Sequence, residues 1–214
     1  MIAIFDWDGT LCDSIEHIVD AMQDAASEQG FEPPPATAVR NIVGLGLPQA
    51  LAQLFPALDR AEHAQLALAY SRHFAAPERG PARLYEGAIA TLDGLRARGI
   101  ELAVATGKSR RGLDRVLASL GLADYFDSTR CADETHSKPH PRMLHEIMVA
   151  RGKSPGDAVM IGDSEYDMDM ARQAGVRSVG VSFGAHSSDR LASFGPLAVI
   201  DSLQELLELS AFGG

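Results

Sequence analysis

The segment Ile2-Ala3-Ile4-Phe5-Asp6-Trp7-Asp8-Gly9-Thr10-Leu11 places a short apolar run directly before two acidic residues and a glycine. A short apolar run that ends at turn residues is typical of a buried strand. Four further apolar runs alternate with longer segments of helical period, at residues 101–105, 158–161, 178–181 and 197–200. This alternation predicts an α/β protein, in which a Rossmann-like parallel sheet core is flanked by helices.

The composition of the 214 residues restricts the class of protein. Apolar residues make up 46% and charged residues 22%, which is ordinary globular usage. The net charge of −10 would repel nucleic acid and anionic membrane surfaces, so neither is an expected partner. No apolar stretch approaches the roughly 20 residues of a membrane helix, and Asp6 comes too early for a secretory signal. We therefore expect a cytoplasmic protein with Cys12 and Cys131 as buried thiols, either monomeric or dimeric.

The interval between the first two predicted strands is too long for one helical connection, because about 95 residues lie between Phe5 and Glu101. Residues 15–80 have helical period, with breaks at residues 33–35, 44–46 and 54–56. We interpret residues 15–80 as a small all-helical cap inserted into a catalytic α/β core of residues 1–14 and 81–214. The loop 76–81 would lead back to the core, where a helix is predicted over residues 86–98.

Capping residues mark several helix ends. Asp13, with Glu16 three residues later, predicts a helix that starts with a capping box. Glycines that follow helical segments predict left-handed helix ends at Gly99, Gly121, Gly152 and Gly175.

Polar side chains follow three of the predicted strands. Asp6 and Asp8 follow the first strand, Thr106 the second and Asp163 the third. Each alone would as readily be a turn or capping residue. In a parallel sheet, however, the carboxyl ends of the strands share one edge, where ligands bind. Clustered carboxylates require a cation, and hard oxygen ligands favour Mg²⁺.

A lysine is also expected at this edge. Asp6, Asp163 and Asp167 together would carry three negative charges, which one Mg²⁺ and one lysine would neutralise. Lys138 is the candidate, because its proline-rich loop, Ser137-Lys138-Pro139-His140-Pro141, lies between the second and third predicted strands.

These residues belong to four stretches that resemble, in order, the motifs of the haloacid dehalogenase superfamily. The stretches are Asp6-Trp7-Asp8-Gly9-Thr10-Leu11, Thr106-Gly107-Lys108, Lys138-Pro139 and Gly162-Asp163-Ser164-Glu165-Tyr166-Asp167. The resemblance covers the whole chain and looks closest to the branch that contains phosphoglycolate phosphatases, whose helical cap follows the first motif. It implies a phosphoric monoester hydrolase acting on a small phosphorylated metabolite.

The resemblance also implies catalytic roles. Asp6 resembles the nucleophile that forms an aspartyl-phosphate, and Asp8 the acid/base that protonates the leaving alkoxide and then activates water. Thr106 would bind a phosphoryl oxygen, and Lys138 would balance the charge of the nucleophile and the phosphoryl group.

Metal and substrate contacts follow in the same way. Asp6, Asp163 and the Asp8 carbonyl would hold Mg²⁺, with Asp167 fixing its outer shell. The backbone N–H of Gly9, which has no Cβ, would approach the phosphate.

Asp8 and the cap favour one reaction over its alternatives. An aspartate two positions after the nucleophile implies a phosphatase or a phosphomutase of the β-phosphoglucomutase type. The mutase branch has a basic residue shortly after the cap glycine, whereas Gly44-Leu45-Gly46-Leu47-Pro48-Gln49 has none, which favours a phosphatase. A nucleotidase or pyrophosphatase remains open. A catalytically silent binding protein on this fold would have lost one of Asp6, Asp8, Lys138 and Asp163, and all four are present.

The cap loop and the residues after Thr106 are candidates for substrate recognition. Gly44 and Gly46 would let a backbone loop approach the substrate, and Gly107 and Lys108 adjoin the second motif. Whether Arg110 and Arg111 bind substrate or are solvated helix charges remains open. His136, His140 and His145 match no zinc spacing and are interpreted as loop or surface residues.

Overall fold

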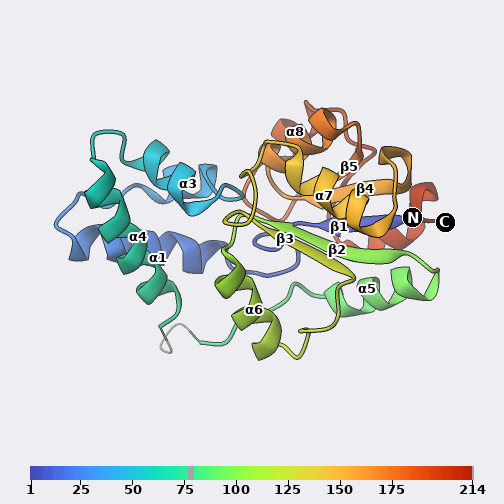
Figure 1. The fold of residues 1–214 in the computed structure, drawn as a ribbon, viewed down its shortest axis with the longest axis horizontal. Coiled ribbons are helices and arrows are strands. Elements are labelled where there is room, and N and C mark those ends of the chain that lie inside the picture. The colour runs from blue at the N-terminus through green and yellow to red at the C-terminus, as the bar shows by residue number, and fades with distance from the viewer. Residues whose placement is uncertain (77–79, 214) are drawn as a thin grey trace.

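A computed structural model describes residues 1–76 and 80–213, in which six strands form one parallel sheet in the order β3-β2-β1-β4-β5-β6 (Figure 1). The strands are β1 (Ile2–Phe5), β2 (Glu101–Thr106), β3 (Ser128–Cys131), β4 (Ala158–Gly162), β5 (Arg177–Val181) and β6 (Val199–Ile200). β1 lies between β2 and β4, and Ile2 pairs with Glu101 on one side and with Ala158 on the other. All four residues of β1 are buried, as expected for a central strand of a parallel sheet.

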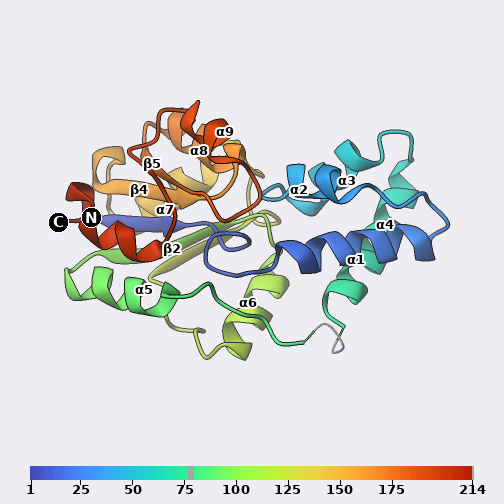
Figure 2. The same cartoon turned by 180° about the vertical axis from the view of Figure 1, so that it is seen from behind.

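Helices cover both faces of the sheet (Figures 1 and 2). α5 (Ala88–Ala97) and α6 (Arg110–Ser119) pack on the face that contains Ala3 and Phe5. α7 (Arg142–Arg151) and α8 (Glu165–Ala174) pack on the face that contains Ile2 and Ile4. The alternation along β1 therefore supplies both layers of the core. The shorter elements are α9 (Ser188–Ala192) and the 3-10 helices η2 (Pro155–Asp157), η3 (Leu203–Glu208) and η4 (Ser210–Phe212).

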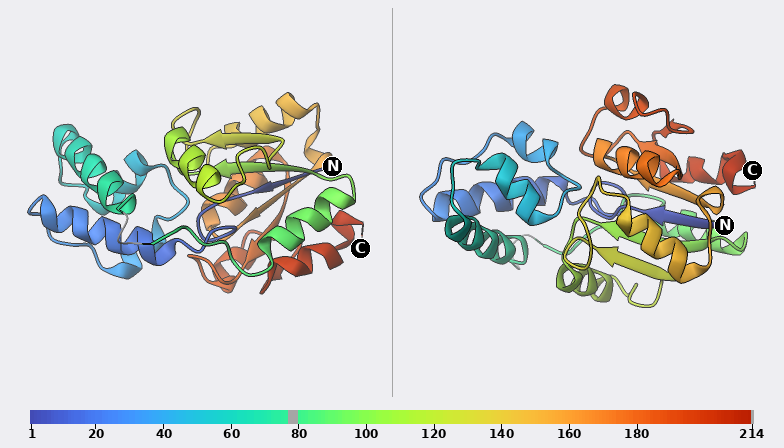
Figure 3. Two further views of the ribbon diagram at one scale, coloured as in Figure 1. Left: turned by 90° about the horizontal axis from the view of Figure 1, so that it is seen from below. Right: turned by 45° about the horizontal axis from the view of Figure 1, so that its top comes forward.

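A helical insertion lies between β1 and β2 in the sequence. It contains α1 (Ile15–Glu28), α2 (Ala36–Asn41), α3 (Leu47–Leu54) and α4 (Arg60–Phe74). These helices enclose their own apolar core, in which Met22 of α1 and Leu66 of α4 are buried. Figure 3 shows the insertion beyond one end of the sheet.

The predicted helical insertion and its three breaks are confirmed, because the breaks fall between consecutive helices. The domain limits 1–14, 15–80 and 81–214 stay a prediction, and residues 77–79 of the predicted loop 76–81 lie outside the described residues.

The two segments that connect the insertion to the core run side by side. The Asp13 N–H donates to the Arg83 carbonyl at 2.9 Å, and the Tyr85 N–H donates to the Leu11 carbonyl at 3.0 Å.

The predicted strands are confirmed with small shifts at their ends, and the predicted helix 86–98 corresponds to α5. The strand β3 was not predicted, because it lies at the edge of the sheet and only Cys131 of its four residues is buried. Cys12 and Cys131 are free and buried, as expected. Among the described residues, no helix combines the length and apolarity that crossing a membrane requires.

The helix-end predictions have mixed outcomes. The four glycines predicted to end helices have φ angles between +63° and +74°, which confirms their left-handed conformation. The capping box at Asp13 and Glu16 is wrong. α1 begins at Ile15 after Ser14, whose hydroxyl donates to the Asp8 carboxylate at 2.6 Å and therefore does not cap the helix.

Candidate active site

The site lies where the strand order reverses, between β1 and β4. The chain runs from β1 to β2 and β3 on one side and then returns to β4 on the other. Asp6 follows β1, Asp163 follows β4, and Thr106 ends β2, so all three lie at the carboxyl edge of the sheet. A reversal of this kind is where doubly wound sheets bind ligands.

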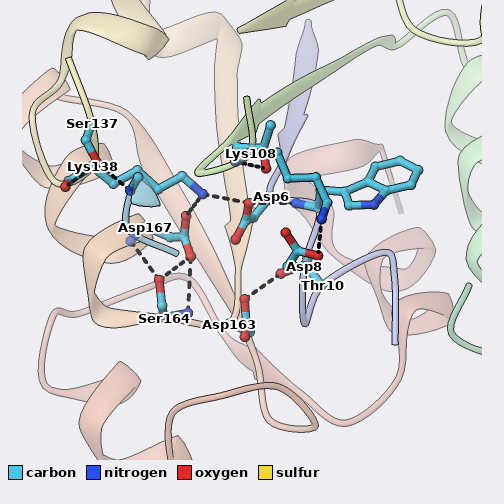
Figure 4. Close-up of polar contacts among 12 residues, drawn as sticks. Asp6, Asp8, Thr10, Lys108, Ser137, Lys138, Asp163, Ser164 and Asp167 are labelled. Carbon is cyan, nitrogen blue, oxygen red and sulfur yellow. Dashed lines mark hydrogen bonds and ion pairs between the residues drawn. The ribbon is translucent and has the colours of Figure 1, made fainter. Parts of the chain in front are cut away.

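Lys138 lies between Asp6 and Asp167 (Figure 4). Its Nζ is 2.7 Å from Asp6 Oδ1 and 2.7 Å from Asp167 Oδ1, and all three side chains are buried. Burial alone would lower the pKa of Lys138, but the carboxylates of Asp167 and Asp6 raise it above its usual value. The structure therefore places the Lys138 ammonium beside Asp6, the predicted nucleophile.

Asp163 lies beside Asp6 and is held by two hydrogen bonds. The Thr10 hydroxyl donates to Oδ1 at 3.0 Å, and the Ala185 N–H donates to Oδ2 at 2.7 Å. Burial and the charge of Asp167 raise the pKa of Asp163 to about 7. Burial and a neighbouring negative charge destabilise the ionised form of this carboxyl group, so a bound cation would stabilise it.

The predicted contact between the Gly9 N–H and the phosphate is wrong. Its N–H donates to the Cys12 carbonyl at 2.9 Å, so this amide is used within the loop and is not directed at a phosphate. Gly9 has a φ of +78°, and a Cβ there would lie 2.1 Å from Asp163 Oδ2. A glycine at this position allows the first motif to lie against Asp163.

Helix capping positions Asp167. Ser164 precedes α8, and the Asp167 Oδ2 atom accepts from the Ser164 N–H at 3.1 Å and from its hydroxyl at 2.6 Å. This capping box turns the other oxygen of Asp167 toward Lys138.

The acidic cluster fits a divalent cation. Asp6, Asp163 and Asp167 each offer a carboxylate oxygen within 4.8 Å of the others. Among the described residues, the buried Asp6 Oδ2 has no hydrogen-bond partner, so it retains its lone pairs for a cation. Burial raises the pKa of Asp6. An all-oxygen donor set of this kind suits Mg²⁺.

Asp8 lies at the mouth of this cluster, toward the helical insertion. Its Oδ1 accepts from Ser14 and is 3.0 Å from Lys108 Nζ. The Lys108 ammonium also lies 4.3 Å from the centre of the Phe74 ring, at the end of α4. Lys108 thus joins the predicted acid/base to the insertion through an ion pair and a cation–π contact.

The loop between α2 and α3 packs closely on the core. A Cβ on Gly107 would lie 2.4 Å from the Leu45 carbonyl oxygen, and a Cβ on Gly44 would lie 2.7 Å from Ser164 Oγ. The Gly46 N–H donates to Ser137 Oγ at 2.7 Å. The glycines at 44 and 107 therefore permit contact between the insertion and the core, which gives each a structural role in addition to the predicted contact with substrate.

A cleft of about 500 Å³ lies between the insertion and the core. Asp6 and Asp8 line it from the core, and Gly44, Gly107 and Lys108 line it near the junction, whereas Gly46 is held away at Ser137. The volume is within the range of about 300–1,000 Å³ that is common for small-molecule sites.

The structure distinguishes the two arginines that the sequence left undecided. Arg110 pairs with Glu134 at 2.8 Å and with Asp114 at 3.1 Å, and these contacts raise its pKa. Arg111 lines the cleft.

The histidines lie elsewhere. His136 and His140 stack on each other with ring centres 4.4 Å apart, outside this cleft.

Four hydroxyl side chains in the site were not singled out in the sequence. They hold Asp163, Asp8, the Gly46 amide and Asp167, and they are Thr10, Ser14, Ser137 and Ser164. Serine and threonine occur in many loops, so their residue type alone does not indicate a site. The sequence signal for Thr10 and Ser164 was their position inside the recognised motifs.

Comparisons with known proteins identify the family of this chain. A family model of haloacid dehalogenase-like hydrolases matches residues 3–181. A phosphoglycolate phosphatase of Rhodospirillum rubrum is 36% identical over 212 residues, which cover 95% of this chain and 88% of the relative. A phosphoglycolate phosphatase of Agrobacterium fabrum is 33% identical over 210 residues, which cover 96% and 90%. The crystal structure of a hydrolase from Pseudomonas syringae, 22% identical, superposes with a TM-score of 0.88 over 97% of this chain and 96% of that chain, so the two share a fold.

The chain therefore belongs to the haloacid dehalogenase-like hydrolase family. Within this family it is a phosphatase of the phosphoglycolate phosphatase-like kind.

Proposed function

We propose that the protein is a Mg²⁺-dependent phosphatase that hydrolyses a small phosphorylated metabolite through an aspartyl-phosphate on Asp6. The observation that carries this proposal is the buried arrangement in which Asp6 contacts Lys138 while its Oδ2 atom keeps free lone pairs. The names of the relatives support an organic phosphate of the phosphoglycolate kind as substrate.

In the first step, a carboxylate oxygen of Asp6 forms a bond to phosphorus while the bond from phosphorus to the alcohol oxygen breaks. Protonated Asp8 gives its proton to the leaving alkoxide. In the second step, Asp8 removes a proton from water, whose oxygen attacks phosphorus and releases the Asp6 carboxylate and inorganic phosphate. The two steps together consume one ester and one water.

The remaining residues bind and orient the phosphoryl group. Lys138 supplies a buried positive charge beside Asp6. The Thr106 hydroxyl accepts from the Lys108 N–H at 3.2 Å, so its own proton is available for a phosphoryl oxygen. Ser14 and Lys108 keep Asp8 at the mouth of the cleft.

Asp6, Asp163 and the Asp8 carbonyl would hold Mg²⁺, with Asp167 in support. The metal would neutralise charge on the transferring phosphoryl group.

Metal removal tests the proposal. We expect release of phosphate from phosphoglycolate or p-nitrophenyl phosphate to stop after chelation with EDTA and to return with Mg²⁺. Ca²⁺ should inhibit, because it takes more ligands at longer distances and favours coordination by both oxygens of Asp6. Undiminished activity after exhaustive chelation, or rescue by Zn²⁺ alone, would contradict the assignment.

Gly46→Val tests whether the loop of the insertion assists the reaction. A Cβ on Gly46 would lie 2.9 Å from Gln49 Oε1, 3.0 Å from Ala132 Cβ and 3.1 Å from Ser137 Oγ, so the valine must displace the loop or these neighbours. We expect kcat/KM to fall about tenfold for the preferred ester and far less for acetyl phosphate, which needs little help from the insertion. Gly156→Val is the control, because among the described residues a Cβ on Gly156 meets only Ser154 Oγ, at 3.9 Å, and neither Gly46 nor Gly156 has a positive φ. Equal losses on both substrates would contradict a role in substrate choice.

A further inference from the structure

The wall of the cleft that comes from the insertion is apolar. Its apolar side chains include Ile18 and Met22 of α1, Ile42 and Val43 after α2, and Leu68 of α4. Leu68 is 68% exposed, although it is a large hydrophobic residue. An exposed leucine within a concave wall is suited to contact an apolar ligand group.

Two arginines of α6 line the same cleft. Arg111 and Arg115 are four residues apart and therefore project from the same side of the helix. Within residues 1–76 and 80–213, neither side chain forms an ion pair or a hydrogen bond. Arg72 on the opposite side of the cleft, by contrast, pairs with Glu28 at 2.6 Å.

The charge of the cleft opposes that of the whole chain. Among the described residues, its lining contains four basic side chains, which are Arg72, Lys108, Arg111 and Arg115, and two acidic ones, Asp6 and Asp8. The chain as a whole carries a net charge of −10. A local excess of positive charge in a concave site attracts anions.

The phosphoryl group does not account for this excess. Two residues are proposed to bind it: Lys138, which is buried beside Asp6, and Thr106, which is buried at the end of β2. Lys108 is already paired with Asp8. Arg111 and Arg115 are thus left for a second anionic group on the alcohol part of the substrate.

We propose that the cleft selects phosphate monoesters of extended alcohols, with an apolar body that packs on Leu68 and Phe74 of α4 and a second anion that binds Arg111 and Arg115. This inference rests on the proposed phosphatase activity and assigns its substrate class. A short acid such as glycolate offers a carboxylate but no apolar body, so it would leave the exposed Leu68 side chain in water.

A matched substrate series tests this class. Phosphoglycolate, 3-phosphooxypropanoate and 6-phosphooxyhexanoate vary the length of the alcohol, and hexyl phosphate keeps the length but lacks the carboxylate. Hexanediol bisphosphate replaces the carboxylate with a second phosphate. We expect kcat/KM to rise with chain length and to be roughly tenfold higher for 6-phosphooxyhexanoate than for hexyl phosphate. A gain with the bisphosphate instead would identify the second anion as a phosphate.

Two variants separate the contributions of charge and apolar surface. Arg111→Gln/Arg115→Gln should lower the ratio of kcat/KM between 6-phosphooxyhexanoate and hexyl phosphate about tenfold. Leu68→Gln should lower the ratio between hexyl phosphate and phosphoglycolate severalfold. The matched controls are Arg60→Gln and Val149→Gln, which replace exposed residues outside the cleft and should leave both ratios unchanged.

The outcomes distinguish this inference from the proposed function. If phosphate is released but phosphoglycolate is the best ester of the series, the extended substrate class is wrong and the phosphatase stands. If neither the carboxylate nor the second phosphate improves kcat/KM, or the arginine variant behaves like Arg60→Gln, the second anion site is wrong. If the wild-type protein releases no phosphate from any ester with Mg²⁺, the proposed function itself fails.

Discussion

Asp6→Asn is expected to reduce the release of phosphate by about a thousandfold or more, because an amide cannot form the aspartyl-phosphate. The change is nearly isosteric. Burial raises the pKa of Asp6, which means that the fold disfavours its ionised form, and a neutral side chain should therefore be tolerated. Lys138 also keeps its contact with Asp167. We expect the melting temperature to stay at or above that of the wild-type protein in EDTA.

The measurement is single-turnover release of phosphate at saturating Mg²⁺, together with thermal unfolding. Asp124→Asn is the control, because Asp124 is exposed and lies outside the cleft. Trapping of a phosphorylated protein by acid quench should succeed with the wild type and fail with Asp6→Asn. Activity within tenfold of wild type, with Asp6→Asn folded, would remove Asp6 from the nucleophile role.

Much of the fold and of the site could be predicted because the informative residues lie in short buried segments. The four residues of β1 are all apolar and buried, and the polar residue that follows such a strand lies at the edge of the sheet. The same reasoning located Asp163 after β4 and Thr106 at the end of β2. The position of its proline-rich loop between the second and third predicted strands made Lys138 the candidate lysine, and the motif resemblance then implied its role.

Other features depend on tertiary contacts that local patterns do not encode. The sequence predicted a capping box at Asp13 and Glu16, but the helix begins after Ser14, whose hydroxyl binds Asp8 because the loop after β1 turns back on itself. β3 is a half-buried edge strand and so lacks the apolar signal of the others. The spacing of Arg111 and Arg115 fixes a common helix face, but only the position of the insertion shows that this face lines a cleft.

Lys138→Met is expected to lower the free energy of unfolding by about 3–5 kcal/mol in metal-free buffer, because it leaves Asp6 and Asp167 buried without a counter-charge. Methionine keeps most of the apolar stem, so little of the loss comes from packing. Lys153→Met is the matched control. Lys153 lies 2.6 Å from Glu101, but both side chains are partly exposed, and an ion pair of this kind contributes about 1 kcal/mol or less.

The comparison is made by urea unfolding at pH 8 in EDTA and again with Mg²⁺. A divalent cation that binds the acidic cluster only in the folded state should restore part of the stability lost in Lys138→Met, since it replaces some of the missing positive charge. It should restore none of the small loss in Lys153→Met. If the two variants lose equally little stability, the buried carboxylates do not depend on Lys138 for charge balance. Lys138 would then act on the bound phosphoryl group alone, and its replacement would lower kcat without changing the unfolding midpoint.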